Sequence, residues 1–175
     1  MKNTYALITG ASSGIGLEIA YKLAEKGYGI ILTARREDRL ITYTNEIKDK
    51  YGVNVDYVTG DLAMPETPQN IYNFCKDKNY SVEVLVNNAG YGLPSQFHKT
   101  SMEDEEKSIR VLSTSVIALS KAFIPDMLEN KSGKIMIISS VASFTPPSTI
   151  QVLYGPLKTF MNRFSDALNV NYKHK

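Results

Sequence analysis

The amino-acid sequence predicts an α/β fold built on a doubly wound sheet of five parallel strands in the order 3-2-1-4-5. Short apolar runs, each long enough for one buried strand, alternate with longer segments whose apolar residues recur at helical spacing. The strand candidates are apolar almost throughout, which is typical of a parallel sheet covered by helices on both faces. Right-handed crossovers between such strands wind the sheet in two directions from the first strand.

The expected elements alternate along the whole chain. Strands are expected at residues 5–8, 30–33, 53–58, 82–86 and 134–138. Helices are expected at residues 17–24, 36–50, 65–77, 101–129 and 151–171, with a kink near the end of the fourth at Pro125. The sequence contains no repeat, low-complexity stretch or linker, so we expect residues 1–175 to form a single domain.

The composition is that of an ordinary globular protein, with 43% apolar and 22% charged residues. A net charge of +2 is too small to indicate a nucleic-acid or anionic-membrane partner. Cys75 is the only cysteine, which excludes an intrachain disulfide and favours a small buried apolar role. Neither His98 nor His174 has metal-ligand spacing, so no metal is expected.

The ends of the chain and its apolar runs bear on location. Met1–Thr4 runs directly into the first strand, so we expect no signal peptide. No uninterrupted apolar stretch is long enough to span a bilayer. We therefore expect a soluble, cytoplasmic protein with no membrane partner.

A glycine loop between the first strand and the first helix predicts a nucleotide site. Gly10 allows a sharp turn, Gly14 lets the backbone approach a pyrophosphate, and Gly16 lets the helix pack close to the strand. The free N–H groups at the start of the helix then face the anion. From this loop we expect cofactor contacts from Gly10, Ser12, Ser13, Gly14, Ile15 and Gly16.

Polar residues follow each of the other strands, at the sheet edge where ligands of wound sheets bind. They are Arg35 and Arg36 after the second strand, Asp61 after the third, Asn87 and Asn88 after the fourth, and Ser139 and Ser140 after the fifth. A carboxylate at the end of the second strand would accept hydrogen bonds from the adenine ribose of NAD, but Ala34 stands there. Arg35 can pair with a 2′-phosphate, with a contact from Ser12, so we predict NADP. The alternative is that both arginines belong to a solvated helix start.

A tyrosine and a lysine lie four residues apart in the last expected helix. Tyr154 and Lys158 therefore share one helix face, and an ammonium near a phenol favours the phenolate form, which suits acid–base chemistry. The pattern is common on surface helices. Its place after the fifth strand directs it toward the cofactor.

Four motifs occur in one order: T-G-A-S-S-G-I-G, N-N-A-G, I-S-S and Y-x-x-x-K. With them the whole chain resembles the short-chain dehydrogenase/reductase family, whose fold is Rossmann-type. The resemblance implies hydride transfer between a nicotinamide dinucleotide and a carbonyl or alcohol. It implies that Tyr154 exchanges the hydroxyl proton, Lys158 holds the nicotinamide ribose and Ser140 hydrogen-bonds the substrate oxygen. It also implies cofactor contacts from Asp61, Leu62, Asn88, Ala89, Gly90, Tyr154 and Lys158.

The sequence departs from the family pattern in three places. Counting the family's usual interval from Asn87 to its helix asparagine leads to Leu112, so a proton relay is broken or rerouted through Ser113. Fourteen positions separate Ser140 from Tyr154, one more than is common, which leaves Ser139 as an alternative. The third departure is length, because a sixth strand, a substrate loop and a seventh strand would be expected after the last helix.

Two functional hypotheses follow from these residues. The first is an oxidoreductase that moves a hydride between NADP(H) and a small carbonyl or secondary alcohol. The alternative is an NADP-binding protein with impaired or no catalysis, such as a sensor or an oligomer subunit, which Leu112 and the short C-terminal part favour. The resemblance implies a homodimer or homotetramer formed through the long helix and the last helix. A pure assembly protein is disfavoured by the glycine loop.

Overall fold

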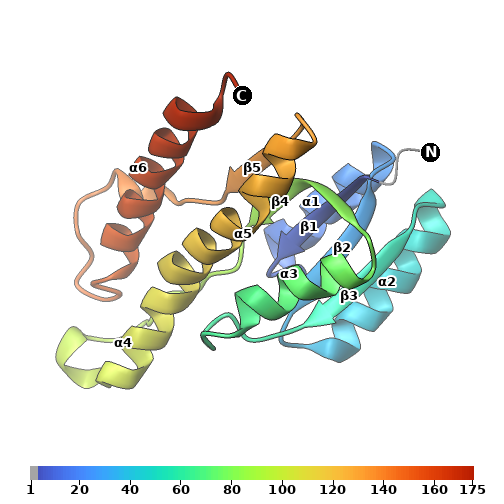
Figure 1. The fold of residues 1–175 in the computed structure, drawn as a ribbon. Helices are drawn as coiled ribbons and strands as arrows, with labels where there is room; N and C mark the ends of the chain where they lie inside the picture. Colours follow the sequence, from blue (N-terminus) through green and yellow to red (C-terminus); the bar gives the residue numbers. More distant parts are fainter. Residues whose placement is uncertain (1–3) are drawn as a thin grey trace.

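A computed structural model describes residues 4–175 and contains one five-stranded sheet (Figure 1). The strand order β3-β2-β1-β4-β5 and the parallel pairing of every neighbouring pair confirm the predicted winding. Residues 1–3, from which we expected the chain to run directly into the first strand, lie outside the described residues. The strands are β1 (Thr4–Thr9), β2 (Gly29–Ala34), β3 (Val55–Thr59), β4 (Ser81–Asn87) and β5 (Lys134–Ile137).

Helices cover both faces of the sheet, and alternate residues of its strands point into two cores. Leu7, Ile31 and Leu85 belong to one core, and their neighbours Ile8 and Leu32 belong to the other. The first core is completed by α3 (Thr67–Asp77) and α5 (Ser115–Glu129), and the second by α1 (Gly14–Glu25) and α2 (Glu37–Tyr51). Burial on both faces explains why the strand sequences are apolar without alternation.

The segment expected as one helix over residues 101–129 contains an internal change of winding. It comprises α4 (Met102–Ile109), a π-helical segment (Arg110–Thr114) and α5. The hydroxyl of Ser101 accepts a hydrogen bond from the Asp104 amide at 3.1 Å and caps α4. The helix continues past Pro125 to Glu129. Side-chain periodicity did not predict the π-helical segment.

The same helical segment bears on the expectation that no uninterrupted apolar stretch could span a bilayer, because charged residues such as Lys121 interrupt it although its overall composition is apolar. Met102–Glu129 is long enough and, with a mean hydropathy of 1.4 over its best window, apolar enough to do so by length and composition. Half of that window is buried inside the fold. Its apolar residues, among them Leu119 and Phe123, pack on the sheet, so core packing accounts for its hydropathy.

The boundaries of the elements differ from those expected by one to three residues, and β3 and α6 are examples. The strand predicted over 53–58 begins at Val55, and the helix predicted over 151–171 is α6 (Tyr154–Tyr172). Gln151 has a φ of +58°, a left-handed conformation that cannot belong to a right-handed helix. This residue therefore lies in a turn before α6 rather than in its first turn.

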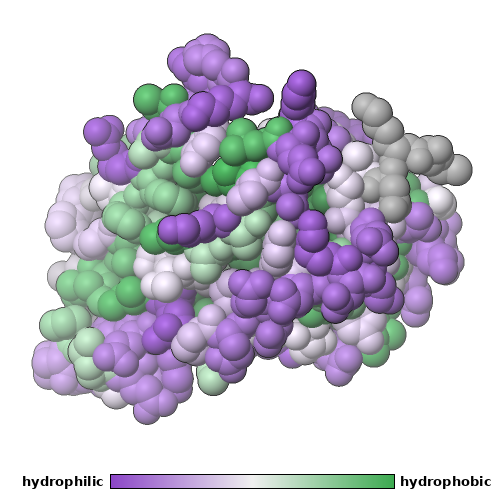
Figure 2. All heavy atoms as spheres, in the orientation of Figure 1, coloured by the Kyte–Doolittle hydropathy of each residue, from purple (hydrophilic) through white to green (hydrophobic). Residues whose placement is uncertain are grey.

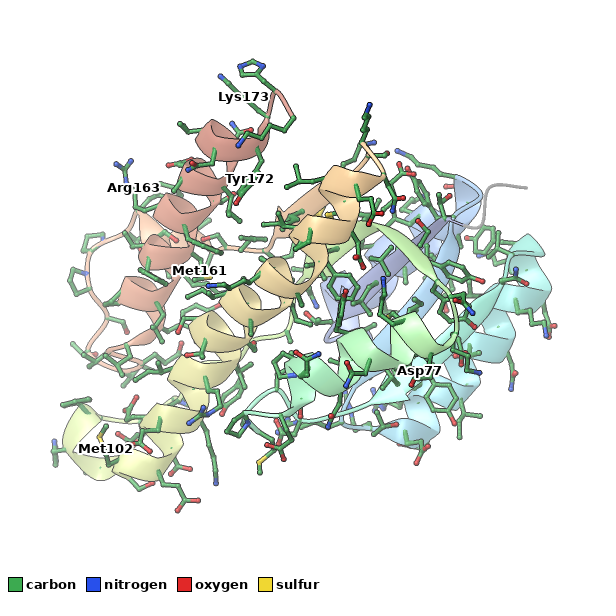
Figure 3. The ribbon with its side chains drawn as sticks, viewed as in Figure 1. Asp77, Met102, Met161, Arg163, Tyr172 and Lys173 are labelled. Carbon is green, nitrogen blue, oxygen red and sulfur yellow. The ribbon has the colours of Figure 1, made fainter. Side chains whose placement is uncertain are left out.

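An apolar groove lies between α5, β5 and α6. In Figure 1, α6 lies beside α5, and in Figure 2 hydrophobic side chains are exposed between the two helices. On α6, Met161 is buried on the side toward α5, whereas Arg163 points outward (Figure 3). The residues that line the groove include the apolar Ile124, Met127, Ile135, Ile137 and Leu168, together with charged residues such as Lys134, Asp166 and Lys173.

Candidate cofactor site and active site

A cleft of about 390 Å³ opens at the carboxyl ends of the strands, where the winding of the sheet reverses. The structure brings most of the predicted site residues together there. Those lining the cleft are Gly10, Ser12, Ser13, Ile15, Arg35, Asp61, Leu62, Asn88, Ala89, Gly90, Tyr154 and Lys158. Gly14, Gly16 and Ser140 do not line it.

Close contacts of Gly10 and Gly16 with neighbouring segments of the chain determine the shape of the glycine loop. A Cβ on Gly10, which has a φ of +68°, would lie 2.8 Å from the Ala89 Cα. A Cβ on Gly16 would collide with the Asn88 amide and lie 2.7 Å from the Gly10 carbonyl oxygen, so this glycine packs inside the fold. Gly14 has a φ of +58° and open space above it, which leaves room for a ligand at the start of α1.

Thr9 and Asn88 hold the glycine loop against the end of β4. The Thr9 hydroxyl accepts hydrogen bonds from the amides of Asn88 (2.9 Å) and Ala89 (3.0 Å). The Asn88 side chain donates to the carbonyl oxygens of Thr9 (2.9 Å) and Gly10 (3.3 Å). Asn88 therefore shapes the loop in addition to lining the cleft. Thr9 was not among the predicted site residues, although its place directly before Gly10 could have indicated this role.

Arg36, rather than Arg35, is joined to the glycine loop. Its Nη2 donates to the hydroxyl oxygens of Ser12 (2.8 Å) and Ser13 (3.0 Å), and both arginines line the cleft. The end of β2 is Ala34, so no carboxylate faces the position of an adenine ribose there. The first turn of α1 also lacks acidic residues. This edge of the cleft is thus suited to an anionic group.

The Asp61 carboxylate takes part in the turn after β3. Its Oδ1 accepts a hydrogen bond from the Ala63 amide at 2.9 Å, and its backbone carbonyl accepts one from the Thr67 hydroxyl at 2.7 Å. Leu62 is 7% exposed beside it. The two residues form an ordered wall of the cleft near the ends of β2 and β3.

Tyr154 and Lys158 line the same cleft as the glycine loop. The Lys158 ammonium lies 5.7 Å from the centre of the Tyr154 ring and donates to the Ile138 carbonyl oxygen at 2.7 Å. Lys158 is only 5% exposed, and this burial lowers the pKa of its ammonium. Its Nζ is also 3.6 Å from the position that a Cβ on Gly90 would take. The positive charge of Lys158 thus lies close to both Tyr154 and Gly90 in the cleft.

The two serines after β5 have different partners. The Ser139 hydroxyl donates to the Lys158 carbonyl oxygen at 3.1 Å and lies 3.0 Å from the Ser143 hydroxyl. The Ser140 hydroxyl accepts from the Ala142 amide at 3.1 Å, which leaves its own O–H free to donate. Ser139 lines the cleft and Ser140 lies beside it, so the role of Ser140 stays a prediction.

Leu112 and Ser113 offer no polar group to the cleft. Leu112 is 1% exposed, and its Cδ2 would lie 2.7 Å from a Cβ on Gly90. The Ser113 hydroxyl donates to the Ile109 carbonyl oxygen at 2.6 Å, one turn back in the helix. A relay through Ser113 would require this hydrogen bond to break.

Further lining residues were not predicted. Thr33, Gly60, Tyr91 and Ile138 lie at strand ends or in the loops directly after them, which is the signal that could have identified them. Val111 comes from the π-helical segment Arg110–Thr114, for which no such signal exists. Cys75 lies away from the cleft in a core, where burial, together with the charge of Asp56, raises the pKa of its thiol to about 12. Among residues 4–175, no group of three or more His, Cys, Asp or Glu side chains could hold a metal ion.

The wound sheet, the glycine loop and the paired tyrosine and lysine are those of the short-chain dehydrogenases, a class of oxidoreductases. A model of this family, described as short chain dehydrogenase, matches residues 4–175. The chain therefore belongs to the short-chain dehydrogenase family.

Individual relatives extend the comparison. The chain is 35% identical over 166 residues to a probable NADP-dependent dehydrogenase of Haemophilus influenzae, covering 94% of this chain and 64% of the relative. It is 34% identical over 177 residues to the very-long-chain 3-oxoacyl-CoA reductase of Bos taurus, covering 98% of this chain and 55% of that protein.

Solved structures show the same arrangement. A short-chain dehydrogenase from Sphingobium yanoikuyae in complex with NADPH superposes with a TM-score of 0.90 at 31% identity, covering 97% of this chain and 65% of that one. The L-sorbose reductase of Gluconobacter frateurii, complexed with NADPH and L-sorbose, has a TM-score of 0.88 at 30% identity, covering 98% and 66%. The chain thus spans about half to two thirds of the length of these relatives.

Proposed function

We propose that this protein is an NADP-dependent oxidoreductase that interconverts a small carbonyl compound and the corresponding secondary alcohol. The observation that carries the proposal is the Lys158 ammonium, buried beside the Tyr154 ring on the rim of the cleft that the glycine loop opens. The proposal treats residues 1–175 as one domain that binds the dinucleotide and carries the catalytic residues.

The residues of the cleft fit the dinucleotide. The close packing at Gly10, the open space at Gly14 and the start of α1 suit a diphosphate. Ser12, with Arg36 joined to it and Arg35 nearby, would hold the 2′-phosphate that distinguishes NADP from NAD. Bound NADPH would supply the hydride from C4 of its nicotinamide.

Tyr154 and Lys158 would together supply the proton that the substrate oxygen gains. As the carbonyl carbon is reduced, the Tyr154 hydroxyl donates its proton to the carbonyl oxygen, which becomes the alcohol. The nearby Lys158 ammonium would stabilise the phenolate that remains, and it would also hold the nicotinamide ribose of a bound dinucleotide. The free O–H of Ser140 donates to the same substrate oxygen and orients it.

Tyr154→Phe tests this assignment. The variant removes the proton donor but keeps the ring, so turnover should fall by roughly 100-fold or more, whereas the Kd for NADPH should stay within about twofold. NADPH oxidation with a panel of ketones and aldehydes measures turnover, and fluorescence titration measures binding. Turnover equal to that of the wild type would exclude the proposed role of Tyr154.

A second candidate function is NADP binding without turnover, and the apolar environment of Leu112 favours it. Leu112 covers Gly90, and the Ser113 hydroxyl is bonded within its own helix, so neither residue offers a relay to Tyr154. Under this alternative, NADPH binds to the wild type but no carbonyl in the panel oxidises it. Hydride transfer to any of these substrates would exclude the alternative.

The proposal includes a homodimer or homotetramer and a cytoplasmic location. The apolar groove between α5 and α6 supports association through these helices. The packing of Met102–Glu129 on the sheet supports a location away from the membrane. Sedimentation of the purified protein tests the first statement, and fractionation of cells tests the second.

A further inference from the structure

The turn that leads into α6 contains a residue in an unusual conformation. Gln151 has a φ of +58°, which residues with a Cβ rarely adopt. Within residues 4–175, Asn79 and Lys131 are the other non-glycine residues with positive φ, and both lie in turns directly after helices. Gln151 instead lies three residues before Tyr154, the proposed proton donor.

Gln151 connects the loop after Gly90 to the start of α6. Its amide N–H donates to the Ser95 carbonyl oxygen at 3.4 Å, and its own carbonyl oxygen accepts from the Tyr154 amide at 3.0 Å. Its side chain lies against Gly92, where an added Cβ would collide with the Gln151 Oε1 and lie 2.7 Å from its Cδ. One residue therefore contacts both the loop after Gly90 and the turn that leads into α6.

This connection is closely packed. The space between the loop and the turn is about 10 Å³, enough for one water molecule at most. It is lined by Glu105 and Ser108 of α4 as well as by Gln151 and Tyr154. Glu105 is 7% exposed, and its carboxylate accepts a hydrogen bond from the Thr100 hydroxyl at 2.6 Å. Helix α4 therefore packs against this loop and helps to hold it in place.

We propose that Gln151 is a positioning residue for Tyr154. Its left-handed backbone turns the chain so that α6 begins at the tyrosine, and its amide group fixes that turn against Gly92. The Tyr154 hydroxyl is thereby held at one place relative to Lys158 and the cleft. This inference rests on the proposed function, since it assigns Gln151 a part in placing the proton donor.

Two substitutions at Gln151 separate the backbone from the side chain. Gln151→Gly keeps the left-handed backbone accessible but removes the amide group, so kcat should fall roughly tenfold, because small displacements of a reacting group cost that much or more. KM and the Kd for NADPH should stay within about twofold, since the dinucleotide end of the cleft is unchanged. Gln151→Asn tolerates positive φ and keeps a shorter amide group, so it should recover kcat to within about threefold of the wild type.

Gly92→Ala provides an independent route to the same effect. The added methyl group displaces the Gln151 side chain without removing it, so kcat should fall as it does in Gln151→Gly. The double variant should have a kcat within about twofold of Gln151→Gly alone, because both changes disrupt one contact. Lys131→Gly is the matched control: it also removes a side chain at positive φ, but in the turn after α5, and it should leave kcat unchanged.

Hydrogen exchange supplies a readout that does not need turnover. In Gln151→Gly, the backbone amides of residues 152–158, apart from Pro156, should exchange roughly threefold faster or more, while exchange in the sheet stays as in the wild type. A wild-type kcat in Gln151→Gly, or an equal loss of NADPH binding and of overall stability, would overturn the positioning role. If wild-type protein binds NADPH but reduces no carbonyl, the proposed function fails. In that case, unchanged exchange at 152–158 in the variant would overturn the inference, and faster exchange confined to these residues would support the contact on which it rests.

Discussion

At the scale of single residues, the two arginines after β2 have different surroundings. Arg36 donates to Ser12 and Ser13, whereas Arg35 lines the cleft without a hydrogen bond to that loop among the described contacts. A side chain already held in place loses less conformational freedom when a ligand pairs with it. Arg36 is therefore better prepared than Arg35 to bind a phosphate.

Arg36→Ala should weaken NADPH binding selectively. Loss of a charge-assisted hydrogen bond costs about 1.5–3 kcal/mol, which corresponds to a Kd for NADPH roughly 10- to 100-fold higher. The Kd for NADH should change by less than about threefold, because NADH lacks the 2′-phosphate. Titration of both cofactors measures the effect, with Arg39→Ala in α2 as a control. Equal weakening of both would contradict the assignment.

Lys158 should make stability depend on alkaline pH. Burial places its pKa in the folded protein below the ordinary value of 10.5 that we assume for the unfolded chain. Between these two values the unfolded chain binds more protons, so stability increases as the pH rises through this window. Lys158→Met lacks this contribution.

Urea unfolding of both proteins at several pH values from 7 to about 10.5 measures the effect. The free energy of unfolding of the wild type minus that of Lys158→Met should rise across this range, because titration of the other groups cancels in the difference. A flat difference would show that the lysine titrates alike in both states.

At the scale of elements, the glycine loop depends on how closely α1 approaches β1 and β4. Gly16→Ala places a methyl group against the Asn88 amide and the Gly10 carbonyl oxygen, inside a closely packed region. Overpacking of this kind should lower the free energy of unfolding by about 1–3 kcal/mol. It should also weaken NADPH binding, since Asn88 holds the loop through its side chain.

Gly14→Ala is the comparison for this variant, because the space above Gly14 is open and only its positive φ opposes a side chain. Its cost should be about 1 kcal/mol. Thermal or urea unfolding of the two variants separates packing from backbone conformation. A smaller loss in Gly16→Ala than in Gly14→Ala would contradict the packing described for α1.

Most of the helices and strands, and their order in the sheet, could be predicted from the sequence. Apolar runs such as Ile30–Thr33 located the strands, and the winding followed from handedness rules, because both depend on local pattern. The turn at Gln151 was not accessible, since its conformation depends on contacts with Gly92 and Ser95 far away in the chain. The π-helical segment Arg110–Thr114 was missed for another reason: it is a single turn, and a shift in apolar spacing over so few residues is hard to tell from ordinary irregularity.

The sequence allowed us to predict that the candidate site lies at the ends of the strands. It did not allow us to predict which individual atoms contact one another there. Position along the chain could not decide which of Arg35 and Arg36 joins Ser12, because adjacent residues differ only in side-chain direction. Position along the chain also could not show that the Ser140 hydroxyl accepts a hydrogen bond from the Ala142 amide, because this contact depends on the conformation of the loop. The prediction that Lys158 lies near Tyr154 was the easier one, since helical spacing alone places them on one face.

At the scale of the whole molecule, β5 is the outer strand of the described sheet on the side of α6. Its Met136 side chain is 44% exposed, and the groove between α5 and α6 adds further apolar surface. Outer strands with exposed apolar side chains favour pairing with other chains.

Residues 1–175, purified as a separate chain, should therefore self-associate in a concentration-dependent way. Met136→Lys should lower the association constant roughly tenfold, because a charge on an outer strand opposes pairing. Sedimentation velocity over a range of concentrations measures the association constant. Met102→Lys, at an exposed position of α4, is the control. Identical association of both variants would indicate that contact between copies does not involve β5.

The hydrogen bond from the Thr9 hydroxyl to the Val86 carbonyl oxygen joins residues 77 positions apart in the sequence. Protein synthesis makes the glycine loop before the groups that hold it in shape, because Asn88 and Ala89 follow it much later in the sequence. A nascent chain on the ribosome consequently has no finished cleft until this later stretch has left the exit tunnel. During translation, the final shape of the loop has to wait for the second half of the sheet.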